Sequence, residues 1–244
     1  MNIKSFDGLT LHGTYLKSKG ESNKSVICFH GYTGNAVDDF ASLAVFYHKN
    51  NFNVLMVDMR AHGKSEGKYI GFGVLDRFDA INWIKYIIKR TGENSKILLH
   101  GISMGAATVL MSGGFGFPLN VKGIVADCGF TSVYEIFSHI LKRDYHIPKF
   151  PLMLITETMT RKRAGYGFGD INTVDVLKNI KIPALFIHGE LDDFVPMWMT
   201  EKNYKACAGE KKFLLIRGAD HAESYYIDTE EYKSALRDFT GKYF

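Results

Sequence analysis

Six short apolar runs, each followed at once by a polar or glycine residue, constrain the fold of this chain more than any other feature. They are residues 26–29, 54–57, 97–99, 124–126, 184–187 and 213–216. Runs that are apolar at every position fit strands covered on both faces, as in a parallel sheet. Helix-like segments lie between most of them. Alternating strands and helices predict an α/β fold with a mostly parallel central sheet.

Four segments have the apolar spacing of helices. They are residues 37–49, 74–90, 104–111 and 229–239. The segment 104–111 has almost no polar face, so we expect that helix to be buried. Near the start of the chain, Asp7-Gly8 separates two strand-like stretches, which predicts a hairpin.

Residues 131–172 interrupt the alternation of strands and helices. This segment has helical patterns but no good strand, and it is rich in Met, Phe and Tyr. We expect a cap-like insertion within one α/β domain that covers residues 1–244. The basic run 161–163 is more typical of a solvated surface than of a site that attracts anionic substrates.

Composition and charge argue against several classes of protein. A net charge of +4 is too weak to indicate nucleic-acid binding. The three cysteines have no CxxC spacing, so a zinc site is not expected. No apolar run approaches the roughly 20 residues of a membrane-spanning helix. The first residues do not resemble a signal peptide. We therefore expect a cytoplasmic protein without a membrane span.

Gly101-Ile102-Ser103-Met104-Gly105 has the pattern G-x-S-x-G. It follows one predicted strand and precedes the buried helix. In that context the serine lies on a sharp turn that exposes its hydroxyl beside a helix N-terminus. In open α/β sheets, ligands bind at the carboxyl ends of the strands, which is where this turn lies. Ser103 is therefore our candidate nucleophile.

A serine hydroxyl needs a base, and the base needs a carboxylate to orient it. His221 follows the last predicted strand and is our candidate base. Asp192 follows the preceding strand and is our candidate acid, although Asp193 is an alternative if the loop is aligned one position differently. The resulting order, Ser then Asp then His, is that of the α/β-hydrolase triad.

Acyl transfer also needs donors for the oxyanion that develops in the transition state. The backbone N–H of Met104, directly after the nucleophile, is one candidate. The backbone N–H of Tyr32, in the glycine-containing loop after the first apolar run, is the other. The Tyr32 side chain is equally consistent with shaping the substrate pocket and with packing of the loop. Phe130 and Phe194 follow core strands, and we expect both to form pocket walls.

Five segments together resemble the α/β-hydrolase superfamily. They are HGYTG at 30–34, DMRAHGKSEG at 58–67, GISMG at 101–105, HGELDDFVP at 188–196 and GADHAES at 218–224. Within that superfamily the chain most resembles bacterial carboxylesterases and the related feruloyl-esterase-like and peptidase-like hydrolases. The resemblance implies a metal-free and cofactor-free ester hydrolase with a cap at 131–172, and it favours Asp192 as the acid.

The sequence thus predicts a serine esterase that acts on a small-molecule ester through an acyl-enzyme intermediate. A thioesterase or small peptidase with the same triad is an alternative, as is a non-catalytic ligand-binding protein on the same fold. His30, His100 and His188 each precede a glycine at a strand end. We expect them to support the structure by hydrogen bonding, and Asp58 to brace the loop that follows it.

Overall fold

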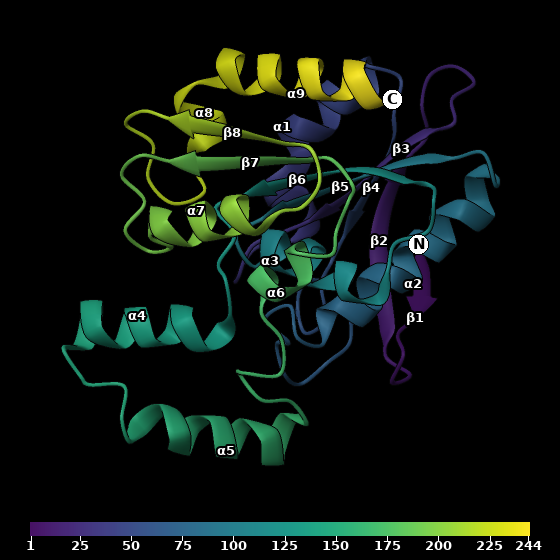
Figure 1. Ribbon diagram of the computed structural model, residues 1–244. Coiled ribbons are helices and arrows are strands. Elements are labelled where there is room, and N and C mark those ends of the chain that lie inside the picture. Colours follow the sequence, from purple (N-terminus) through teal and green to yellow (C-terminus); the bar gives the residue numbers. More distant parts are fainter.

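The computed structural model describes all 244 residues and is built around one eight-stranded sheet (Figure 1). The strands are β1 (Asn2–Lys4), β2 (Thr10–Leu16), β3 (Lys24–Phe29), β4 (Asn53–Val57), β5 (Lys96–Ile102), β6 (Val121–Asp127), β7 (Ala184–Gly189) and β8 (Lys211–Ile216). Their spatial order is β1-β2-β4-β3-β5-β6-β7-β8. All pairs from β4 to β8 in this order are parallel, and the first two pairs are antiparallel. The predicted parallel sheet and N-terminal hairpin are confirmed.

Nine helices accompany the sheet. They are α1 (Ala36–Lys49), α2 (Asp76–Thr91), α3 (Met104–Ser112), α4 (Val133–Tyr145), α5 (Leu152–Ala164), α6 (Thr173–Leu177), α7 (Met197–Ala206), α8 (Ser224–Ile227) and α9 (Thr229–Tyr243). The four predicted helices correspond to α1, α2, α3 and α9. Helices α6, α7 and α8 were not predicted from the sequence.

Alternate side chains of each central strand enter two separate cores. Ile27 and Phe29 of β3 belong to the core beneath α2, α3 and α7, whereas Val26 and Cys28 belong to the core beneath α1 and α9. All four are almost fully buried. Burial on both faces explains why the strand sequences are apolar throughout rather than alternating with polar residues.

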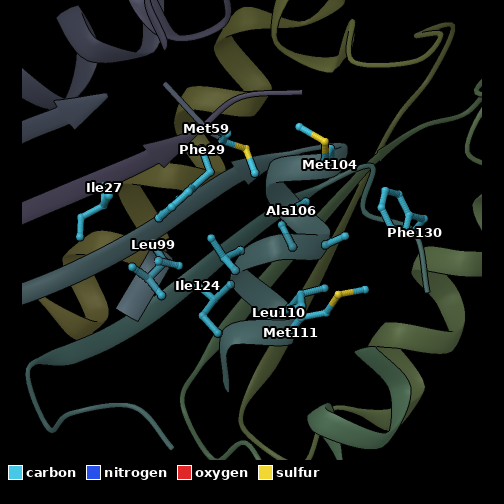
Figure 2. Close-up of a cluster of buried hydrophobic side chains, with 14 of the residues drawn as sticks. Ile27, Phe29, Met59, Leu99, Met104, Ala106, Leu110, Met111, Ile124 and Phe130 are labelled. Carbon is cyan, nitrogen blue, oxygen red and sulfur yellow. The ribbon is translucent and has the colours of Figure 1, made fainter. Parts of the chain in front are cut away.

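Helix α3 lies against the centre of the sheet, and every one of its residues is buried, as its sequence predicts. Figure 2 shows Met104, Ala106, Leu110 and Met111 of this helix among side chains of β3, β5 and β6. The helix can approach so closely because Gly105 has no side chain. A Cβ at Gly105 would lie 1.9 Å from the carbonyl oxygen of Phe29.

The predicted insertion contains α4 and α5 and no strand. Figure 1 shows these two helices standing away from the layer that holds α3, α6 and α7. Only Val133 and Ile136 of α4 and Met153 of α5 are buried. The loop after α5 adds the buried rings of Tyr166 and Phe168, so the segment joins the core through a few side chains rather than along whole helices.

None of the nine helices combines the length and the apolar character required to cross a lipid bilayer.

We expect Gly105→Ala to destabilise the protein by about 3 kcal/mol, because the new methyl group would overlap the backbone of β3. Gly241→Ala is the matched control. Gly241 lies in α9 and has open space around its Cα, so alanine there should be neutral or stabilising by up to roughly 1 kcal/mol. Urea unfolding of both variants measures the difference. Equal midpoints would show that α3 can move away from the sheet at no cost.

Candidate active site

Ser103 lies on a strained turn between β5 and α3. Its φ of 52° is in the left-handed region, which a residue with a side chain rarely adopts. The turn is tight because Gly101 and Gly105 pack on each other, and a Cβ at Gly101 would lie 2.3 Å from the carbonyl carbon of Gly105. The Ser103 N–H donates to the Asp127 carbonyl of β6 at 2.8 Å. These contacts fix the direction of the serine side chain.

The three residues of the predicted triad lie in one hydrogen-bonded chain. Ser103 Oγ is 2.9 Å from His221 Nε2, and His221 Nδ1 is 2.7 Å from Asp192 Oδ2. A carboxylate only accepts hydrogen bonds, so Nδ1 carries the proton and Nε2 accepts from the serine hydroxyl. The other carboxylate oxygen of Asp192 accepts from the N–H of Val195 at 2.8 Å. In this arrangement His221 can remove the Ser103 proton.

The structure brings Asp192, and not Asp193, to the histidine. Asp192 is buried, whereas the side chain of Asp193 is 80% exposed. Asp193 accepts a hydrogen bond from Arg143 of α4 at 3.1 Å. The two neighbouring carboxylates therefore have different surroundings, and only one of them can orient His221.

Hydrogen bonds from backbone N–H groups join the loop that carries Asp192 to the loop that carries His221. The N–H of Leu191 donates to the Ala219 carbonyl at 2.8 Å, and the N–H of Gly218 donates to the Glu190 side chain at 3.1 Å. These bonds hold Asp192 and His221 close together although they are 29 positions apart in the chain. The short distance between Asp192 and His221 follows from this pairing.

The expected oxyanion donors come from the start of α3 and from the loop between β3 and α1. Met104 is the first residue of α3, where a helix leaves its N–H groups unpaired. The loop with Tyr32 is held by Asp39 of α1, whose carboxylate accepts from the Gly31 N–H at 2.8 Å. His30 also braces this loop, since its ring nitrogens hydrogen-bond to the Gly31 carbonyl and the Met59 N–H. This role of Asp39 was not predicted from the sequence.

Comparison with known proteins agrees with this architecture. A family model described as the alpha/beta hydrolase fold matches residues 24–154. The chain belongs to the α/β-hydrolase fold family. The Bacillus subtilis (strain 168) protein YqkD is 30% identical over 237 residues, which are 97% of this chain and 77% of YqkD.

Two solved structures of this fold are similar over the whole chain. The esterase Pf2001 from Pyrococcus furiosus has a TM-score of 0.77 and 26% identity, and the match covers 100% of this chain and 90% of the esterase. Est1E from Butyrivibrio proteoclasticus, solved with ferulic acid bound, has a TM-score of 0.79, and the match covers 100% of this chain and 98% of the Est1E chain. Est1E is only 19% identical, so that likeness concerns the fold.

A cavity of about 620 Å³ opens over the serine of this α/β-hydrolase. Tyr32 and Phe194 line it, and the Phe194 ring lies 4.9 Å from the His221 ring. Phe130 does not line it, so the expectation that it forms a wall is wrong. Phe130 turns back toward α3 after the end of β6 and is only 4% exposed (Figure 2). Its position after a strand did not determine which way it points.

The histidines expected to support the structure do so through buried hydrogen bonds. His100 lies between the hydroxyls of Tyr47 and Tyr232, at 2.9 and 3.1 Å. His188 bonds to Thr200 at 2.9 Å, and burial lowers its pKa, which keeps it neutral. Asp58 accepts from the N–H groups of Ala36 and Lys64, and so braces the loop after β4 as predicted.

Asp127, at the end of β6, is a further acidic residue of the site. It lines the Ser103 cavity although it is only 2% exposed. Burial raises its pKa to about 6, and the Tyr232 hydroxyl, which donates to it at 3.0 Å, opposes that rise. Ser224 lies near enough to favour the ionised form, yet neither its hydroxyl nor Asp127 Oδ1 has a hydrogen-bond partner. In the sequence, Asp127 is marked by its position directly after the apolar run 124–126.

One group of side chains has atoms close enough to share a metal ion. The ligand atoms of Cys128, Asp192 and His221 lie within 4.8 Å of one another. Burial raises the pKa of the Cys128 thiol well above its usual value, so the sulfur stays protonated, and metals bind the thiolate. Asp192 and His221 are already hydrogen-bonded to each other. The chemistry of these residues fits acid–base catalysis better than metal binding.

We expect Asp127→Asn to stabilise the protein at neutral pH by up to about 3 kcal/mol, because asparagine removes a buried charge and still accepts from Tyr232. The pKa of Asp127 rises from 3.8 to about 6 on folding, so its ionisation costs stability as the pH rises through that window. The difference in unfolding free energy between variant and wild type should grow from pH 4 to 6 and level off above pH 7. Urea unfolding across this range measures it. A difference that does not change with pH would contradict this account.

Proposed function

We propose that this protein is a serine hydrolase that cleaves small-molecule carboxylic esters through an acyl-enzyme intermediate. The hydrogen-bonded chain from Ser103 through His221 to Asp192, at the floor of an open cavity, is the observation that carries the proposal. Each member comes from a different strand end, and structural proteins have no need for this arrangement.

In the first half of the reaction, Ser103 Oγ attacks the ester carbonyl carbon while His221 Nε2 takes its proton. Asp192 holds the imidazole in the required tautomer and stabilises the positive charge that forms. The carbonyl oxygen becomes an oxyanion, and the backbone N–H groups of Tyr32 and Met104 donate to it. Because the loop and the helix end are already fixed, little reorganisation is needed.

In the second half, the tetrahedral intermediate collapses and the C–O bond to the alcohol breaks. His221 gives its proton to the leaving alcohol, and the acyl group remains on Ser103. A water molecule, deprotonated by His221, then attacks the acyl carbon. The second tetrahedral intermediate releases the carboxylic acid, and the proton returns to Ser103 Oγ.

We prefer ester hydrolysis to thioester or peptide hydrolysis. The solved structure that is 26% identical over the whole chain is named an esterase, and the triad and the oxyanion donors suit an ester carbonyl without further groups. A peptide would in addition need specific contacts along its backbone. The three cysteines are all free, which supports a reducing, cytoplasmic location.

We further propose that the segment 131–172 is a cap that shapes the substrate site. Arg143 of α4 lines the Ser103 cavity. Met159 and Arg163 of α5 line a second cavity of about 460 Å³. Tyr32 borders both cavities, so the cap and the oxyanion loop meet where the substrate would lie.

Ser103→Ala should abolish hydrolysis of p-nitrophenyl esters from acetate to decanoate, with a loss on the order of 10⁵-fold or more, because no nucleophile remains. Ser112→Ala is the control: Ser112 is buried in the same helix and bonds only to the Val109 carbonyl, so activity should persist. Labelling by a fluorophosphonate should follow the same pattern.

A folded wild-type protein that neither hydrolyses these esters nor takes up the label would refute the proposal and favour the non-catalytic binding protein. Labelling without ester turnover would retain the triad and direct attention to thioesters and peptides.

A further inference from the structure

The cavity over Ser103 is acidic although the chain as a whole is basic. The chain has 30 Lys and Arg against 26 Asp and Glu. In the cavity lining this balance is reversed, since Arg143 is the only Lys or Arg there. Its acidic residues are Asp38, Asp39, Asp127, Asp193, Asp220 and Glu223. A local reversal of this size concentrates negative potential in the concave part of the surface.

Arg143 does not neutralise this lining. Its guanidinium already pairs with Asp144 at 2.5 Å and with Asp193 at 3.1 Å. It also lies 5.1 Å from the Phe194 ring centroid. Two carboxylates therefore share one positive charge, and the other acidic residues remain without a cation.

Two of those acidic residues are free to meet a ligand. Glu223 lies two residues beyond His221, is exposed, and its carboxylate has no hydrogen bond or ion pair in the structure. Asp38, near the oxyanion loop, is also exposed, and its carboxylate accepts only from the Asn35 side chain at 2.6 Å. The remaining hydrogen-bonding capacity of both carboxylates faces solvent or the cavity.

Asp127 gives an independent sign that positive charge is missing from this cavity. Its Oδ1 is buried and has no hydrogen-bond partner, although the residue lines the cavity. A buried carboxylate oxygen without a donor is costly, and a positive charge nearby reduces that cost. A cationic ligand at the cavity floor would supply that positive charge.

Aromatic rings complete the lining. Tyr32, Phe194, Tyr225 and Tyr226 all border the cavity. The faces of such rings attract ammonium groups, and the attraction is strongest when carboxylates are close by. Carboxylates and aromatic rings together favour an organic cation over a bare metal ion, which would leave the rings unused.

We propose that the substrate carries a protonated amine or quaternary ammonium group in its alcohol part, and that this acidic and aromatic cavity binds it. The inference rests on the proposed ester hydrolysis. His221 protonates the leaving alcohol, so the alcohol lies on the His221 side of the cavity. Glu223, Tyr225 and Tyr226 closely follow His221 in the chain and also line the cavity.

A matched pair of esters tests the charge alone. Acetylcholine and 3,3-dimethylbutyl acetate have the same shape, but the first has a positive nitrogen where the second has a neutral carbon. We expect kcat/KM to be at least tenfold higher for acetylcholine at low ionic strength. The ratio should fall in 0.5 M NaCl because salt screens the exposed carboxylates.

Charge-removing variants locate the effect. Glu223→Gln should lower the ratio about threefold or more, and Asp38→Asn, beside the oxyanion loop, should lower it by less, because each removes a negative charge that attracts only acetylcholine. Glu93→Gln is the matched control. Glu93 is exposed in the turn before β5, and Ser103 follows the other end of that strand. The Glu93 variant should therefore leave the ratio unchanged. Equal hydrolysis of both esters, or equal effects of all three variants, would overturn the inference.

Binding to Ser103→Ala separates this inference from the proposed function. Calorimetric titration of that variant with the two esters requires no turnover. Tighter binding of acetylcholine, weakened by Glu223→Gln, supports the cationic substrate even if the wild type hydrolyses neither ester. Binding that is equal or absent for acetylcholine overturns it, whether or not other esters are cleaved and Ser103 is labelled.

Discussion

The close approach of α3 to the sheet is the constraint on which the rest of the site depends. Gly105 lets the helix backbone touch the end of β3, and this contact forces Ser103 into its strained turn. The same contact brings the N-terminus of α3 beside the loop that follows β3. This backbone contact therefore helps to place the proposed nucleophile and both expected oxyanion donors. The side chains of Asp39 and His30 then hold the loop in place, which suits a site that must be preorganised.

The core elements could be predicted from the sequence because their patterns are local. Strands buried on both faces are apolar throughout, and the strand–motif–helix context of Ser103 lies within residues 96–112. The polar residues at other strand ends were predictable for the same reason, and they led to Asp192 and His221. Helix α7 was not predicted, because its buried positions include Thr200 and Asn203, which do not form an apolar stripe.

Long-range contacts explain what the sequence did not predict. Asp39 was unremarkable in sequence, yet it braces the oxyanion loop because α1 runs back beside that loop. The direction of Phe130 depends on how the chain leaves β6, and Asp127 is unusual only because Tyr232, far along the chain, covers it. The overall charge was equally uninformative. A net charge of +4 gives no sign that the acidic residues gather around Ser103.

In the proposed reaction, Tyr32 would link substrate choice to catalysis. Its backbone N–H is an expected oxyanion donor, and its side chain separates the acidic cavity from the second cavity beneath α5. The second cavity is largely apolar, and its charged residues are Lys68 and Arg163. An ester that lies across Tyr32 would therefore meet opposite environments on its two sides, with the alcohol in the acidic cavity and the acyl group against apolar residues. The Tyr32 ring centroid lies 5.4 Å from that of Phe72, which also lines the second cavity. Specificity can then diverge through residues 131–172 while the catalytic geometry stays constant.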